Sequence, residues 1–182
     1  ILKPFYFMFF KKKKYETISN DIYQKIVNFS RNKIFYTKYG VPDTIDGRFD
    51  LLVLITIIVV HRLSKIKNEG SELSQMIFDI VFKDLDYSLR ELGAGDVSVA
   101  NNMKKLISSY MGRQKIYVKA FKSEDEKFLA SAFKNNIFRN TDQKKNLILL
   151  LSKNIFRINK KLDLIEDKKI INGDFNFSIS LL

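Results

Sequence analysis

Apolar residues recur every three or four positions along most of the chain, a spacing that is typical of amphipathic helices. In the first such segment, from about residue 18 to residue 29, Ile18, Ile22, Ile26 and Phe29 share one face. A short aromatic segment follows at residues 34–36. The pattern therefore predicts an amphipathic first helix and a brief aromatic link to the next one.

The most apolar segment, Leu51–Val60, lies within the second predicted helix, which begins near Asp43 or Thr44 and continues to about Lys67. A helix that is apolar on every side is usually buried in the centre of a fold. Its apolar run would rise only about 15 Å, whereas the hydrocarbon core of a bilayer is about 30 Å thick. The segment therefore predicts a core helix and not a membrane span.

Four further helices are predicted over residues 71–92, 96–121, 123–138 and 141–158. Ser71 and Asp96 are candidate N-caps, and Gly93 suits the left-handed position that follows many helices. Ser123 and Glu126 have the spacing of a capping box. Apolar and polar residues alternate over residues 173–182, which predicts an extended tail laid on the surface.

These elements predict the all-α class, with a single helical domain of about six helices and an extended C-terminal tail. The domain would occupy residues 15–182, behind an aromatic and basic N-terminal tail at residues 1–14. Only 7 of the 182 residues are glycine and 2 are proline, which favours helices over strands and tight turns. This length is sufficient for one hydrophobic core.

The N-terminus, ILKPFYFMFFKKKK, places its apolar residues before its charges. A signal peptide has the opposite order, and no transit-peptide pattern is visible. Lys11, Lys12, Lys13 and Lys14 follow the aromatic residues and suit contact with an anionic membrane surface. A solvated tail is the alternative interpretation.

The formal net charge of +12 suggests an anionic partner, but the kind of basic residue matters. Lysine outnumbers arginine 25 to 7, and isoleucine and asparagine are also abundant. This bias is what the codon usage of an AT-rich genome produces, whereas nucleic-acid sites favour arginine because its planar guanidinium binds phosphate through two hydrogen bonds. Codon bias and contact with lipid headgroups or ribosomal RNA both remain as explanations of the charge.

A carboxylate cluster precedes the central helix in the stretch YGVPDTIDGRFD, residues 39–50. Asp43, Asp46 and Asp50 are candidates for acid–base catalysis or Mg²⁺ binding. Helix-start physics explains the same residues, because Pro42 breaks the preceding structure and aspartates near a helix N-terminus interact favourably with its dipole. The chain has no cysteine and one histidine, so common nucleophile–base pairs and thiolate metal sites are absent, and a binding protein is favoured over an enzyme.

A second polar cluster, DLDYSLRELGAGD, spans residues 84–96. Asp86 and Arg90 are spaced i, i+4, which usually gives a surface ion pair. Arg48 and Arg90 each lie among carboxylates beside apolar runs. We therefore predict that residues 39–50 and 90–96 meet in space and share a partly buried ion-pair network.

Two long motifs resemble a known family. FYTKYGVPDTIDGRFDLLVL and FDIVFKDLDYSLRELGAGDVSVANNMKKLISSYMGR occur in this order and are similar to the ubiquinol–cytochrome c chaperone family. The similarity spans about residues 35–117, with looser agreement on either side. Members of this family occur in alphaproteobacteria and mitochondria.

The resemblance implies a helical assembly factor for respiratory complex III that has no catalytic role and no cofactor. Mitochondrial members help newly made cytochrome b to mature, associate with the inner membrane and with ribosomes, and work with a small partner protein. The expected function is a non-enzymatic chaperone of bacterial type that binds cytochrome b on the cytoplasmic side of the inner membrane, or on the matrix side in a mitochondrion. A small partner subunit, the ribosome and an anionic membrane are further expected partners, and DNA is not.

The resemblance also changes the expected role of the two polar clusters, from attacking a substrate to holding or presenting a protein-binding surface. The residues assigned to this surface or its structural network are Tyr39, Pro42, Asp43, Asp46, Gly47, Arg48, Asp50, Asp86, Arg90, Glu91, Gly95 and Asp96. Two alternatives remain: a basic helical protein that binds RNA or ribosomes, and a hydrolase or metal protein that uses Asp43, Asp46 or Asp50.

Overall fold

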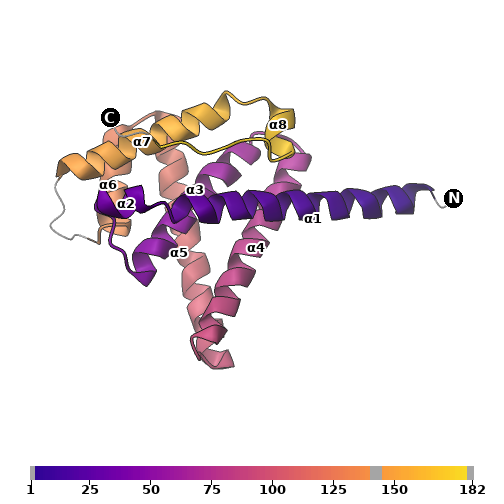
Figure 1. Ribbon diagram of the computed structural model, residues 1–182, viewed down its shortest axis with the longest axis horizontal. Coiled ribbons are helices and arrows are strands. Elements are labelled where there is room, and N and C mark those ends of the chain that lie inside the picture. Colours follow the sequence, from indigo (N-terminus) through magenta and orange to yellow (C-terminus); the bar gives the residue numbers. More distant parts are fainter. Residues whose placement is uncertain (1–2, 140–144, 180–182) are drawn as a thin grey trace.

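The computed structural model describes residues 3–139 and 145–179, with side chains from Lys13 onward, and these residues form helices and no strand. Figure 1 shows their arrangement. The helices are α1 (Lys3–Ser30), α2 (Lys33–Thr37), α3 (Ile45–Leu63), α4 (Glu69–Glu91), α5 (Asp96–Ser123), α6 (Glu126–Asn136), α7 (Lys145–Asp163) and α8 (Asp167–Ile171). The all-α prediction is confirmed.

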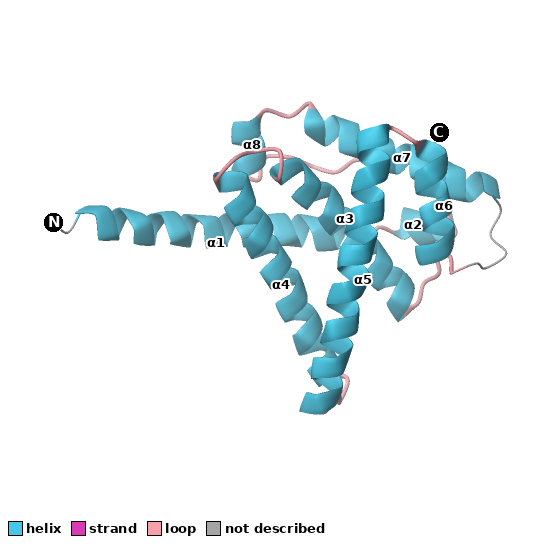
Figure 2. Ribbon diagram, turned by 180° about the vertical axis from the view of Figure 1, so that it is seen from behind, coloured by secondary structure: helices cyan, strands magenta, loops and turns pink. Residues whose placement is uncertain are grey.

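Helix α3 is the centre of the fold. It contacts α1, α4, α5 and α7, and the two opposite views place it between α1 on one side and α4 with α5 on the other (Figures 1 and 2). Leu51, Ile55 and Ile57 have no exposed surface. Burying such a side chain contributes about 1.5–3 kcal/mol. Over the described residues, no helix combines the length and the apolar character needed to cross a bilayer.

Helix α1 is longer than the sequence pattern predicts. It begins at Lys3, so residues 3–14 are helical and continuous with the first predicted helix, and the N-terminal half of α1 extends away from the body of the molecule (Figure 1). Pro4 falls in its first turn, where the missing N–H costs nothing. From Tyr15 onward the predicted apolar face is buried against α3 and α4.

The predicted helix starts need small corrections. Thr44, and not Asp43, is the N-cap of α3, because its Oγ1 accepts a hydrogen bond from the Gly47 amide at 3.1 Å. Helix α4 begins two residues before Ser71. Asp96 is the first residue of α5 and therefore does not cap it.

The capping box predicted at Ser123 and Glu126 does not form. Ser123 is the last residue of α5, and the N-cap of α6 is Asp125, whose carboxylate accepts from the Phe128 amide at 2.8 Å. The predicted start of the next helix at Thr141 lies outside the described residues. Helix α8 was not predicted.

The C-terminal residues that the structure describes run along the surface as predicted. Phe177 stacks on Phe29 of α1 with ring centroids 4.7 Å apart. Lys25 donates hydrogen bonds to the carbonyl oxygens of Gly173 and Phe175 at 2.7 and 2.9 Å. The tail therefore closes one side of the core over α1.

Gly47 allows the loop before α3 to fold back onto the first turn of that helix. A Cβ at this position would lie 2.0 Å from the carbonyl oxygen of Pro42, which is backbone and cannot rotate away. The preceding turn also depends on Gly40, whose φ is +69°. Gly47 therefore permits a close approach of the loop to the helix.

We expect Gly47→Ala to lower the free energy of unfolding by about 1–3 kcal/mol, the usual cost of overpacking a filled site. Gly112→Ala is the matched control, because a Cβ there meets nothing within 4 Å and Gly112 lies inside α5. Alanine in a helix interior is about 0.5–1 kcal/mol more favourable than glycine, so the control should gain stability. Urea unfolding followed by circular dichroism measures both changes, and equal effects of the two substitutions would contradict the assignment.

Candidate functional site

A buried ion-pair cluster at the start of α3 joins three parts of the fold. One oxygen of Asp50 accepts a hydrogen bond from Nη2 of Arg113 on α5 at 2.7 Å, and the other accepts from Nη2 of Arg139, just after α6, at 3.0 Å. The Asp50 side chain is fully buried, that of Arg113 is 9% exposed and that of Arg139 is 45% exposed. Asp46 lies at the edge of the cluster, 3.6 Å from Arg139.

Desolvation dominates the electrostatics of this cluster. Burial raises the pKa of Asp50 to about 6, and the positive charges of Arg113 and Arg139 oppose this rise. Arg113 is further held by Ser109, whose carbonyl and hydroxyl oxygens both accept from Nη1. The arrangement holds α5 against α3 through a directional contact.

The predicted network between Arg48 and Arg90 does not exist. Arg48 pairs with Asp43 at 2.7 Å, and both side chains are more than half exposed. Arg90 pairs with Asp86 and Asp96 at 2.7 and 2.5 Å, at the turn that joins α4 to α5. The prediction that residues 39–50 and 90–96 share buried ion pairs is wrong, because each arginine is paired locally on the surface.

The remaining predicted site residues fall into two groups. Tyr39 and Gly47 are buried and Pro42 is half-buried, and all three support the loop before α3. Glu91 and Gly95 are exposed at the α4–α5 turn.

The four-lysine segment lies on α1, where Lys13 and Lys14 are exposed. The side chains of Lys11 and Lys12 lie outside the part of the chain whose side chains the structure describes.

The carboxylates of Asp43, Asp46 and Asp50 are engaged by arginines. Asp43 is paired with Arg48, and Asp46 and Asp50 share Arg139. Across residues 3–139 and 145–179 no three His, Cys, Asp or Glu side chains group in a way that could hold a metal ion. The geometry therefore gives no support to the metal-site alternative.

Sequence reasoning selected Asp50 but missed both of its partners. Arg113 lies three residues after Tyr110 and four before Tyr117, which are both buried, so it shares their face of α5. A single arginine on an otherwise apolar helical face was the available signal. Arg139 carries no such signal, because it follows the end of α6.

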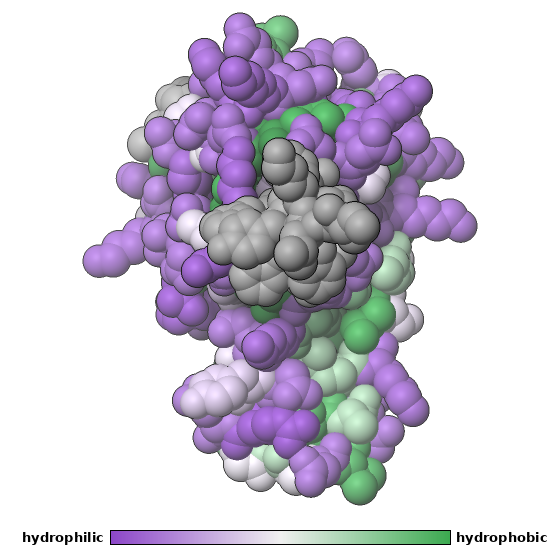
Figure 3. Space-filling view, turned by 90° about the vertical axis from the view of Figure 1, so that its right-hand side faces the viewer, coloured by the Kyte–Doolittle hydropathy of each residue, from purple (hydrophilic) through white to green (hydrophobic). Residues whose placement is uncertain are grey.

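The α4–α5 hairpin projects from the body and carries exposed apolar residues at its tip. Tyr87, Leu92 and Val97 are 62%, 71% and 78% exposed. Figure 3 shows hydrophobic surface running down one side of this projection. We call these three residues the hairpin tip.

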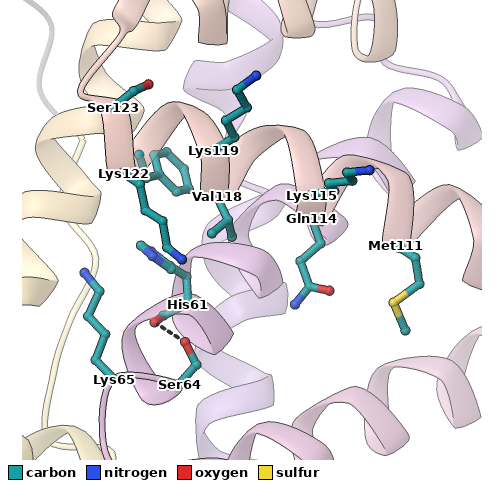
Figure 4. Close-up of a pocket in the computed structure, with 11 residues that line it drawn as sticks. His61, Ser64, Lys65, Met111, Gln114, Lys115, Val118, Lys119, Lys122 and Ser123 are labelled. Atoms are coloured by element: carbon teal, nitrogen blue, oxygen red, sulfur yellow. Dashed lines mark hydrogen bonds between the residues drawn. The ribbon is translucent and has the colours of Figure 1, made fainter.

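A hollow of about 880 Å³ lies between the end of α3 and the C-terminal half of α5, and we call it the α3–α5 groove. Its polar lining includes His61 and the four lysines Lys65, Lys115, Lys119 and Lys122 (Figure 4). Its apolar lining is Met111, Val118 and Phe121. None of these residues was predicted from the sequence to form a site.

His61 is held at the base of this groove. Its ring stacks on Phe121 with centroids 5.6 Å apart, and its Nδ1 lies 3.3 Å from Oδ1 of Asn159. Because that oxygen is an acceptor, Nδ1 carries the hydrogen, and Nε2 finds no protein partner among the described residues. Burial lowers the pKa of His61 and the charge of Lys65 lowers it further, so the imidazole is neutral near pH 7.

The fold and these surfaces define a helical protein with a buried structural ion pair, an apolar projection and a basic groove. The sequence profile of the ubiquinol-cytochrome C chaperone family matches residues 37–177, so the chain belongs to this family. The match also covers α6, α7 and α8, well beyond the region of resemblance at residues 35–117.

A solved structure is similar along nearly the whole chain. The crystal structure of the Cbp3 homolog from Brucella abortus is 33% identical, with a TM-score of 0.86 over 96% of each chain. Comparison with curated proteins finds no significant match.

We expect Arg113→Met to lower the free energy of unfolding by about 3–5 kcal/mol at pH 8, the usual cost of removing one partner from a buried ion pair. The loss should be smaller at pH 5. In the unsubstituted protein the folded-state pKa of Asp50 is raised to about 6, so the contribution of Asp50 to the free energy of unfolding falls as the pH rises from about 4 to 6. Without Arg113 this contribution continues to fall above pH 6. Urea unfolding at the two pH values measures the difference.

Arg48→Met is the matched control, because it removes the same type of side chain from an exposed pair with Asp43. Its stability should stay close to that of the unsubstituted protein at both pH values. An Arg113→Met loss of equal size at pH 5 and pH 8 would show that Asp50 is not the charge that Arg113 compensates.

Proposed function

We propose that this protein is a non-enzymatic assembly chaperone for ubiquinol–cytochrome c reductase that binds newly made cytochrome b at the membrane. The observation that carries the proposal is family membership over residues 37–177, supported by the structural match to the Cbp3 homolog along nearly the whole chain. Burial of Asp50 between two arginines gives the carboxylate cluster a structural role, which favours binding over catalysis.

The hairpin tip is the surface that we assign to the client. Large exposed apolar residues that gather on one projection are typical of protein-binding sites. Newly made cytochrome b is a membrane protein, so its unassembled helices offer apolar side chains to such a surface. Asp86, Arg90 and Asp96 surround the tip with exposed ion pairs and would form its polar rim.

Peripheral attachment to an anionic membrane completes the proposal. Lys11–Lys14 lie on the part of α1 that extends from the body, and a lysine near an anionic surface contributes about 1 kcal/mol to membrane binding. The proposed location is the cytoplasmic side of the bacterial inner membrane, or the matrix side in a mitochondrion. A small partner subunit and the ribosome are further proposed partners.

Pull-down of the tagged protein from native membranes should recover cytochrome b, and loss of the gene should lower complex III while other respiratory complexes are kept. Mass spectrometry and native gel electrophoresis measure these two results. Recovery of ribosomal RNA without cytochrome b would favour the alternative, an RNA- or ribosome-binding protein, and that binding should weaken steeply with salt.

Leu92→Ser combined with Val97→Ser should lower cytochrome b recovery at least several-fold without changing thermal stability, because both side chains are already in water in the free protein. Ile45→Ser combined with Leu164→Ser is the matched control. These two residues are 76% and 86% exposed but lie outside the hairpin. Equal loss of cytochrome b from both double variants would remove the hairpin tip as the client surface.

A further inference from the structure

The α3–α5 groove contains more positive charge than the fold itself uses. Lys65 pairs with Asp163 at 2.7 Å, but among the described residues no carboxylate pairs with Lys115, Lys119 or Lys122. Lys119 lies over the ring of Phe128 at 5.4 Å, whereas no ion pair or cation–π contact with a described residue engages Lys115 or Lys122. The three lysines are spaced i, i+4 and i+7 on α5, so they follow one side of the helix. Their mutual repulsion has no structural benefit in the free protein.

Two of the lysines lie close to His61. Figure 4 shows Lys122 of α5 extending toward the His61 ring and Lys65, two residues after the end of α3, beside it, while Lys115 and Lys119 lie farther along α5 and point away. Lys122 and Lys65 both disfavour the protonated form of His61, as expected for close positive charges. Within residues 13–139 and 145–179, Asp163 is the carboxylate that acts on this imidazole, and it is paired with Lys65. An anion placed here would relieve the repulsion and would let His61 take up a proton.

The groove continues into a smaller hollow of mixed lining. This second hollow, of about 280 Å³, shares Ser64, Met111 and Gln114 with the groove. Its other lining residues are the apolar or aromatic Val60, Phe78 and Tyr110 and the polar Ser71, Ser74 and Gln75. Met111, at the junction of the two, is 49% exposed. A cationic groove with apolar side chains at one end is complementary to an amphiphilic anion.

We propose that the α3–α5 groove binds an anionic phospholipid, with the phosphate headgroup between Lys65, Lys122 and His61 and an acyl chain over Met111. The apolar side chains of Met111, Val60 and Phe78 at this end of the groove favour a lipid over a soluble phosphate ester. RNA is disfavoured because no arginine lines the groove and Phe121 is only 5% exposed, so neither a guanidinium fork nor an open stacking surface is present.

This inference rests on the membrane-peripheral part of the proposed function and adds a specific lipid site to it. It does not involve the hairpin tip. Failure of the purified protein to bind lipid, while the pull-down still recovers cytochrome b, would therefore overturn this inference alone. Lipid binding without recovery of cytochrome b would contradict the proposed function alone.

The single histidine provides a reporter for the site. In ¹⁵N NMR, short-chain phosphatidylglycerol added to the full chain should shift the imidazole nitrogen signals and raise the pKa of His61. Inorganic phosphate at the same concentration should give a much smaller shift. Met111→Gln should reduce the shift of the His61 signals caused by the lipid and leave the shift caused by phosphate unchanged. An equal response to phosphate and lipid, or no response to either, would overturn the proposal.

Flotation with vesicles tests the lysines. The triple variant Lys115→Gln, Lys119→Gln and Lys122→Gln should bind vesicles of phosphatidylcholine and phosphatidylglycerol about 100-fold more weakly, since each lysine near an anionic surface contributes about fivefold. Lys83→Gln, Lys127→Gln and Lys134→Gln remove the same charge from exposed positions outside the groove and form the matched control.

Three results of this assay would overturn the proposal. The first is an equal loss in the two triple variants, which would show attraction by net charge alone. The second is binding to pure phosphatidylcholine vesicles as strong as to the mixture. The third is displacement of the lipid by RNA at comparable phosphate concentration. Replacing Lys11–Lys14 by glutamine should weaken vesicle binding without changing the His61 response to short-chain lipid, which separates the two basic surfaces.

Discussion

The fold depends on one buried carboxylate. Asp50 lies at the start of the most apolar helix, and an ionised side chain in that position is costly unless charged donors reach it. Arg113 and Arg139 supply them from α5 and from the residue stretch after α6. Apolar side chains still make contact after a small shift between helices, but the hydrogen bond of 2.7 Å between Arg113 and Asp50 would be broken by it. The cluster therefore fixes the face of α5 that is turned toward α3.

The helical pattern predicted the fold well because most of the information is local. Burial of α3 follows from its continuous apolar run, and the faces of α1, α4 and α5 follow from helical spacing. Helix ends were less predictable because several polar residues compete for each cap. Thr44 prevailed over Asp43, and Asp125 prevailed over Ser123, according to which side chain could reach an amide two or three residues ahead.

The candidate site was predicted only in part because its contacts span long distances in sequence. Asp50 is 63 residues from Arg113 and 89 from Arg139, whereas Arg48 and Arg90 found carboxylates within six residues. Where opposite charges lie close together in a sequence, they tend to pair with one another on the surface. The α3–α5 groove was missed for a similar reason, since its lysines are ordinary surface residues until α3 brings His61 beside them.

Helix α5 runs without interruption from the hairpin tip, past Arg113, to the lysines of the groove. It can therefore act as a lever with its fulcrum at Asp50. The arm from Val97 to Arg113 is about 24 Å long and the arm from Arg113 to Lys122 about 14 Å, at 1.5 Å per residue. A tilt that moves the tip by about 2 Å would move the groove by about 1 Å in the opposite direction. A ligand that tilted α5 at one end would therefore move the other end of the helix as well.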